Sequence, residues 1–176
     1  MTNLGQFTFS PIAKNWTPTM EKVNCGKSKL SSIQLREPHM TGTISNQRAL
    51  IYVMVMMSAV EGRMATEEVA EMDLLIRTLP IFKNFDRTRL VTVVQECGDI
   101  LDNTEGMTTV LGLVTNQLPA KLKDTAYALA VEVAAADLAV GKVELRFLAI
   151  LRDALGLDKL VTAAIERSAI ARYQTV

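Results

Sequence analysis

The chain contains one short acidic motif twice. The first copy reads SAVEGRMATEE over residues 58–68, and the second reads AADLAVGKVE over residues 135–144. Each copy places two acids seven residues apart, Glu61 with Glu68 and Asp137 with Glu144, and the copies lie 76 positions apart. Each copy also follows one apolar helical run and precedes another. The pattern predicts an internal repeat of helix, acidic loop and helix.

The similarity between the two halves extends beyond the acids. A shift of 76 positions also carries Met72 onto Leu148, Leu75 onto Leu151 and Leu79 onto Leu155. Apolar residues make up 49% of the 176-residue chain and aromatic residues only 5%, and Ala, Leu, Val and Met are prominent among them. This composition is typical of packed helices rather than sheets. We therefore predict an all-α fold in a single domain.

Start and stop signals divide the chain after residue 44 into seven predicted helices. They run from 45 to 59, from 66 to Pro80, from an N-cap at Asp86 to a turn at 102–104, from that turn to 117, from 119 to 137, from 142 to 155 and from 158 to 173. The first is apolar on most faces after Arg48, which predicts a central, buried position. Its methionines, Met54, Met56 and Met57, are interpreted as core packing rather than as a soft-metal site.

Residues 1–41 differ from the rest of the chain in composition. They are rich in Ser, Thr, Asn, Lys and Pro, which predicts a flexible N-terminal tail. Phe7, Phe9 and Trp16 could instead anchor this tail to the domain or to a partner. The remaining residues, 42–176, form the predicted helical domain.

The charges are unevenly distributed although the formal net charge is zero. Residues 1–48 hold six Lys and Arg against two Glu, a net charge of +4, and residues 49–176 carry −4. A mildly acidic domain argues against nucleic-acid binding, which needs a basic surface facing the phosphates. The longest apolar stretch, Ala49–Val60, has 12 residues, whereas a membrane span needs about 20. We expect a soluble, cytoplasmic protein with no direct membrane span.

The residues needed for common catalytic arrangements are absent or far apart. Cys25 and Cys97 do not have the spacing of a metal knuckle or a redox pair. The only histidine, His39, lies in the tail, where a nucleophile would have to recruit it. No glycine-rich phosphate loop or dinucleotide fingerprint occurs. We expect a non-enzymatic protein with no catalytic residues and no organic cofactor.

The order of helices and the two acidic loops resemble the tellurite-resistance TerB family over about residues 44–158. In that family each loop typically reads Ala/Ser-Asp-Gly, then five residues, then Glu. The resemblance implies a compact bundle of about seven helices with internal pseudo-two-fold symmetry. It also implies a metal-cation site, whose acidic positions fall on Glu61, Glu68, Asp137 and Glu144. Finally, it implies a cytoplasmic stress-response scaffold or sensor whose protein partner is a membrane-associated complex, which would hold it peripherally at the inner membrane.

A cation site also has a physical rationale. Two loops related by two-fold symmetry could bring four carboxylates together, and these would repel one another unless a cation or protons neutralised them. Oxygen ligands favour Ca²⁺ or Mg²⁺ over Zn²⁺. The alternative is a capping role: Glu67, Glu68 and Glu144 lie in the first turns of predicted helices, where a carboxylate is stabilising, and Glu144 could supply one half of a capping box.

Two positions depart from the family pattern. Glu61 stands where the family has Asp, and Leu138 stands where it has Gly. Glutamate is one methylene longer, and leucine does not readily adopt a left-handed backbone conformation. These departures could weaken or remove a site of the family geometry, and they favour the alternative function, a metal-free helical interaction module.

Overall fold

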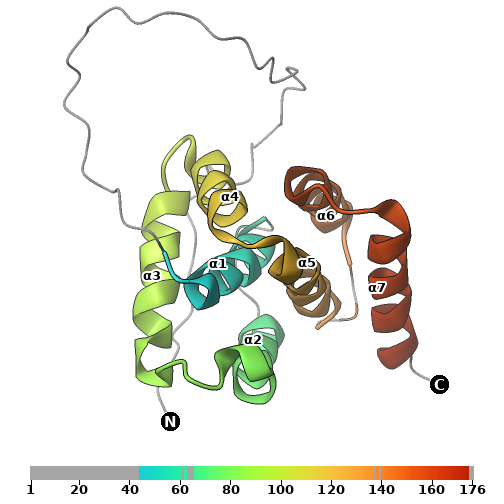
Figure 1. The fold of residues 1–176 in the computed structure, drawn as a ribbon, viewed down its shortest axis with the longest axis horizontal. Coiled ribbons are helices and arrows are strands. Elements are labelled where there is room, and N and C mark those ends of the chain that lie inside the picture. The colour runs from blue at the N-terminus through green and yellow to red at the C-terminus, as the bar shows by residue number, and fades with distance from the viewer. Residues whose placement is uncertain (1–43, 61, 63–65, 137, 139, 175–176) are drawn as a thin grey trace, which may run out of the picture.

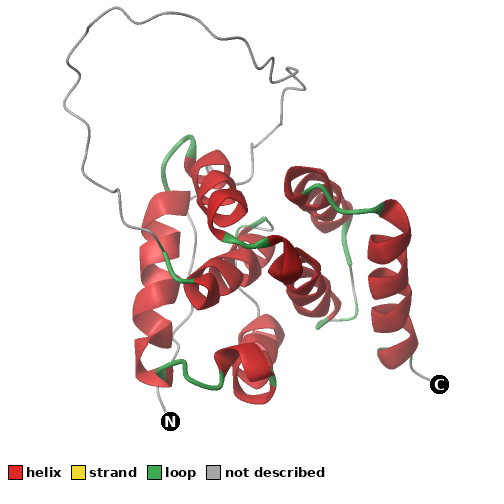
Figure 2. Ribbon diagram, in the orientation of Figure 1, coloured by secondary structure: helices red, strands yellow, loops and turns green. Residues whose placement is uncertain are grey.

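The computed structural model describes residues 44–60, 62, 66–136, 138 and 140–174. These residues form seven α-helices and two short 3₁₀ helices, with no strand among them (Figure 2). The α-helices are α1 (Asn46–Ala59), α2 (Thr66–Thr78), α3 (Leu90–Leu101), α4 (Gly106–Gln117), α5 (Ala120–Ala135), α6 (Lys142–Leu155) and α7 (Lys159–Arg172), and the 3₁₀ helices are η2 (Pro80–Phe82) and η3 (Arg87–Arg89). The all-α prediction is therefore confirmed. The predicted tail, residues 1–41, lies outside the described residues.

Helix α1 is the centre of the bundle. The Ser45 hydroxyl caps its first turn by accepting a hydrogen bond from the Arg48 backbone N–H at 3.2 Å. Every residue from Ala49 to Ala59 is buried, because α2, α3, α4 and α5 all pack around this helix (Figure 1). The predicted central position is confirmed, and the three methionines of α1 are fully buried core residues.

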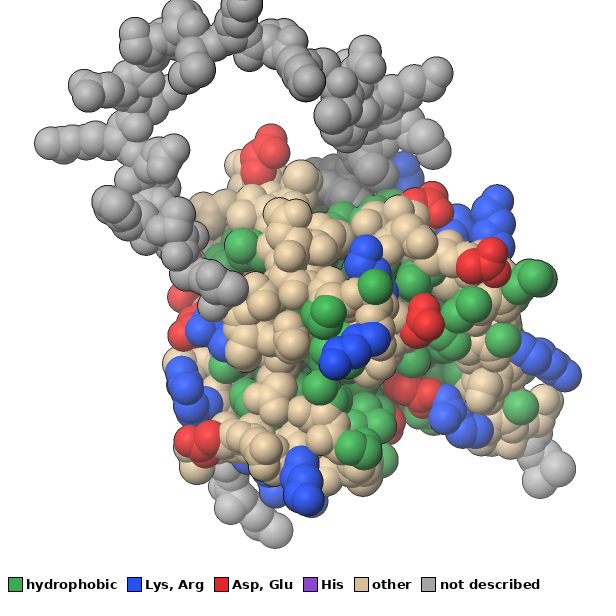
Figure 3. Space-filling model, viewed as in Figure 1, with side chains coloured by type: hydrophobic (Ala, Val, Ile, Leu, Met, Phe, Trp, Pro, Cys, Tyr) green, Lys and Arg blue, Asp and Glu red, His purple; other side chains and the backbone are tan. Residues whose placement is uncertain are grey.

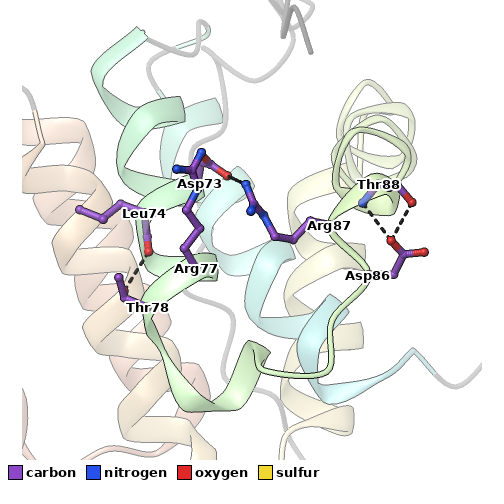
Figure 4. Close-up of polar contacts among 7 residues, drawn as sticks. All are labelled: Asp73, Leu74, Arg77, Thr78, Asp86, Arg87 and Thr88. Carbon is purple, nitrogen blue, oxygen red and sulfur yellow. Dashed lines mark hydrogen bonds and ion pairs between the residues drawn. The ribbon is translucent and has the colours of Figure 1, made fainter. Parts of the chain in front are cut away.

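The segment between α2 and α3 is held by short-range polar contacts (Figure 4). The Asp86 carboxylate accepts hydrogen bonds from the Thr88 N–H at 3.0 Å and from its hydroxyl at 2.7 Å, which lowers the pKa of Asp86. Asp86 was predicted to cap the third helix directly, but it caps η3, and α3 begins at Leu90. The Asp73 carboxylate of α2 forms ion pairs with the guanidinium groups of Arg77 and Arg87. These pairs are largely exposed, so they orient the segment more than they stabilise it.

The C-terminal helices follow their sequence signals closely. Helix α6 covers the predicted residues 142–155, and Gly156 ends it in a left-handed conformation with φ of 67°. The Asp158 carboxylate then caps α7 by accepting hydrogen bonds from the backbone of Leu160 and Val161. Helix α5 ends at Ala135, two residues earlier than predicted. Helix α7 packs against α5 at the side of the bundle opposite α3 (Figure 1).

None of the helices in the described ranges is both long enough and apolar enough to cross a membrane.

Candidate cation site in the paired acidic loops

The backbone of the two acidic loops repeats with the same 76-residue shift as the sequence. Helices α1 and α5 end at residues 59 and 135, and helices α2 and α6 begin at residues 66 and 142. The third residue of the second helix in each copy is a glutamate, Glu68 or Glu144. The repeat therefore exists in the positions of the helix ends as well as in the residue types.

A left-handed residue occurs at the same place in both loops. Gly62 has φ of 78° and Leu138 has φ of 62°, and Leu138 is the only non-glycine residue with positive φ in the described part of the chain. Leu138 adopts this conformation although leucine does not readily do so. Leucine tolerates it at a cost of about 1–2 kcal/mol from the close approach of its Cβ to the following carbonyl. Favourable interactions elsewhere in the fold offset this cost. The second loop therefore has the same left-handed turn as the first, with leucine in place of glycine.

We predict that Leu138→Gly raises the free energy of unfolding by about 1 kcal/mol, because glycine has no Cβ to strain. The Leu138 side chain is 59% exposed, so little burial is lost. The matched control is Leu138→Ala, which removes the same apolar atoms but keeps the Cβ. Urea unfolding of both variants isolates the backbone effect, and equal stability of the two would contradict the strain.

Glu68 and Glu144 are buried although they are acidic. Their exposed fractions are 7% and 3%, and the other buried polar residues in the described ranges are Ser58 and Thr162. One oxygen of Glu144 accepts a hydrogen bond from the Gly141 backbone N–H at 2.6 Å. This is the reciprocal bond of a capping box, as the alternative interpretation of Glu144 predicted. Both carboxylates also lie at helix N-termini, where the helix dipole favours a negative charge.

The first acid of each loop, Glu61 or Asp137, lies outside the described residues. Within the described ranges, no group of three or more His, Cys, Asp and Glu residues is close enough to hold a metal ion. Of the four predicted ligands, the structure thus describes Glu68 and Glu144, and each lies in the first turn of a helix. The meeting of four carboxylates remains a prediction.

Two other titratable side chains, Cys97 and Tyr127, are also deeply buried. Cys97 on α3 is fully buried, and burial raises the pKa of its thiol, so it is not available as a thiolate nucleophile near neutral pH. Burial and a hydrogen bond donated to Glu166 of α7 raise the pKa of the Tyr127 phenol on α5. Both groups therefore act as neutral core residues, and Tyr127 ties α7 to α5.

Sequence reasoning missed the contacts that attach α7 and the hollows beside it. A pocket of about 450 Å³ lies beside the second loop. The exposed side chains of Leu138, Val140 and Ile170 line part of it. A second hollow lies between α2 and α7. No sequence signal marked these hollows, because the depth of a hollow depends on which helices meet there.

No protein-family model matches this chain, and neither a curated protein nor a solved structure matches it.

Proposed function

We propose that this protein is a non-enzymatic helical module of the tellurite-resistance TerB type that binds a divalent cation through its two acidic loops. The observation that carries the proposal is the shared backbone of the loops, in which Leu138 adopts the left-handed conformation of Gly62 despite its strain. Strain that persists in a loop is often linked to a function of that loop. The proposed ligands are Glu61, Glu68, Asp137 and Glu144. Their oxygen atoms suit Ca²⁺ or Mg²⁺ better than Zn²⁺.

The proposed role of the cation is mechanical. Each loop joins two helices, α1 to α2 and α5 to α6. A cation held by both loops would fix the orientation of one helix pair relative to the other. A partner protein that contacts both pairs would then bind according to the cation concentration, as a scaffold or sensor of a stress response requires. On the basis of the resemblance to the TerB family, we also propose a cytoplasmic location and a membrane-associated complex as the partner.

A second candidate function is a metal-free interaction module. The hydrogen bond from the Gly141 N–H to Glu144 favours it, because this bond gives the carboxylate a structural role that needs no cation. Under this alternative the loops would only begin helices α2 and α6, and partner binding would be independent of divalent cations.

Calorimetric titration of chelator-treated protein with Ca²⁺, Mg²⁺ and Zn²⁺ separates the two candidates. We expect saturable binding of Ca²⁺ or Mg²⁺, weakened at least about tenfold by Asp137→Asn and by Glu144→Gln. Glutamine at position 144 still accepts the Gly141 hydrogen bond, so this variant removes charge while keeping the cap. Asp158→Asn is the matched control, since Asp158 also caps a helix but lies outside both loops.

Two results would reject cation binding by the loops. One is the absence of saturable heat with any of the three cations, which would leave the metal-free module. The other is equal affinity in all four proteins, which would place the cation elsewhere. Thermal unfolding with and without cation provides an independent readout, because a cation that binds only the folded state raises the melting temperature.

A further inference from the structure

An open groove lies between helices α2 and α7. Both helices pack against α5, which forms the floor. The groove has a volume of about 860 Å³, and its apolar lining includes Leu74, Leu75 and Leu79 from the α2 side and Leu129 from α5. Leu74, on the α2 wall, is 51% exposed. Figure 3 shows hydrophobic side chains open to solvent in the lower half of this face, with acidic and basic side chains beside them.

The polar lining of this groove is acidic. It contains three carboxylates, from Glu71, Asp124 and Glu132, and one cationic side chain, Arg172. Arg172 pairs with Glu132, whose other oxygen accepts a hydrogen bond from the Tyr173 hydroxyl at 3.2 Å. The lining therefore carries a net negative charge around an apolar floor. This combination fits a segment that is both apolar and basic.

The start of α1, where residues 1–43 join the domain, contacts segments next to two of the groove elements. The Gln47 side chain, in the first turn of α1, donates a hydrogen bond at 2.8 Å to the carbonyl of Ile81, two residues beyond the groove residue Leu79. On the other side, Asn46 contacts Gln117 at 3.5 Å, and the next helix, α5, begins at Ala120 and supplies Asp124 to the groove. Residues 1–43 are thus joined to the domain at a point that contacts the segment after α2 and the segment before α5.

The preceding 43 residues have the composition that the groove requires. They hold five basic residues, Lys14, Lys22, Lys27, Lys29 and Arg36, against two Glu. Apolar and aromatic side chains occur together at Phe7, Phe9, Ile12 and Trp16. The 27 residues between Trp16 and Ile44 can span up to about 90 Å, several times the length of α2, which is about 20 Å.

We propose that residues 7–16 occupy the groove between α2 and α7 of the same chain. The aromatic side chains would cover Leu74, Leu75 and Leu129, and Lys14 would face the carboxylates of Glu71 and Asp124. A partner protein that uses this apolar surface must then displace the segment. This inference goes beyond the proposed cation site and does not depend on it.

Trp16 makes the proposal testable because it is the only tryptophan in the chain. In the full-length protein, we expect Trp16 fluorescence to be blue-shifted and severalfold less sensitive to acrylamide than in a synthetic peptide of residues 1–43. Leu74→Lys should restore the sensitivity of the free peptide, since it places a positive charge on the apolar wall. Leu160→Lys is the matched control: Leu160 is 81% exposed on α7 and does not line the groove. Added salt should also raise the sensitivity by screening the charges.

Three outcomes would overturn the proposal. Equal quenching of the protein and the peptide would show that the segment does not dock. Protection that survives Leu74→Lys would place the segment elsewhere on the domain. Protection that increases with protein concentration, together with dimers in sedimentation, would mean that the groove takes the segment of a second copy instead. Circular dichroism of both lysine variants verifies that the helices are intact.

Discussion

Replacing Phe147 with alanine is expected to lower the free energy of unfolding by about 3–5 kcal/mol. Phe147 lies on α6, is 1% exposed and belongs to the same buried cluster as Leu151 and Leu155. Truncation removes the ring from the core and leaves a cavity that the surrounding helices fill only partly. Because α6 begins with the turn that holds Glu144, loss of this anchor should also loosen the second acidic loop.

The measurement is urea unfolding followed by far-ultraviolet circular dichroism, which reports on the helices. Leu145→Ala is the matched control on the same helix, because Leu145 is 56% exposed. We expect it to change stability by less than about 0.5 kcal/mol. If both variants unfolded at the same urea concentration, α6 would not be packed as described.

Gly106→Ala is expected to destabilise the protein by about 3 kcal/mol, at the upper end of the usual cost of overpacking. Gly106 is the first residue of α4, and a Cβ there would lie 2.3 Å from the carbonyl oxygen of Ile100 and 2.6 Å from the Cα of Leu101. Both are backbone atoms at the end of α3, so no side-chain rotation can relieve the overlap. The two helices would have to separate.

The same helix offers a control with the opposite sign. Gly112 lies in the middle of α4, and a Cβ there meets nothing within 4 Å. Gly112→Ala should therefore raise the free energy of unfolding by about 0.5–1 kcal/mol through its better helix propensity. Thermal and urea unfolding of the pair separate steric overlap from propensity. A loss of stability in both variants would argue that α4 tolerates no added side chain, and a gain in both would contradict the close contact of α3 with α4.

The sequence predicted the helix positions of two proposed ligands, Glu68 and Glu144, but not the backbone conformation of the loop that contains Leu138. The acid spacing correctly placed Glu68 and Glu144 in the first turns of α2 and α6, and the capping bond of Glu144 follows from its position three residues after Gly141. The general preference of leucine against the left-handed conformation did not predict the backbone of Leu138. Packing on both sides of a loop can outweigh a cost of about 1–2 kcal/mol, and no local pattern reports it.

Signals within a few residues were sufficient for the fold class and for most helix ends. Ser45 and Asp158 cap helices by accepting hydrogen bonds from the backbone two or three residues later, and Gly156 ends α6 through its own φ angle. Such interactions are local, so they can be deduced from the order of residues.

Only the tertiary structure decided which distant residues meet. Tyr127 donates a hydrogen bond to Glu166 across 39 positions, the start of α4 touches the end of α3 at Gly106, and α2 and α7 leave a groove over α5. Each of these features depends on how whole helices pack, and helix packing is determined by the summed burial of many side chains rather than by any short motif. The sequence by itself therefore determined where the helices and acidic turns lie, whereas packing decided the strain of Leu138 and the surfaces that remain open for binding.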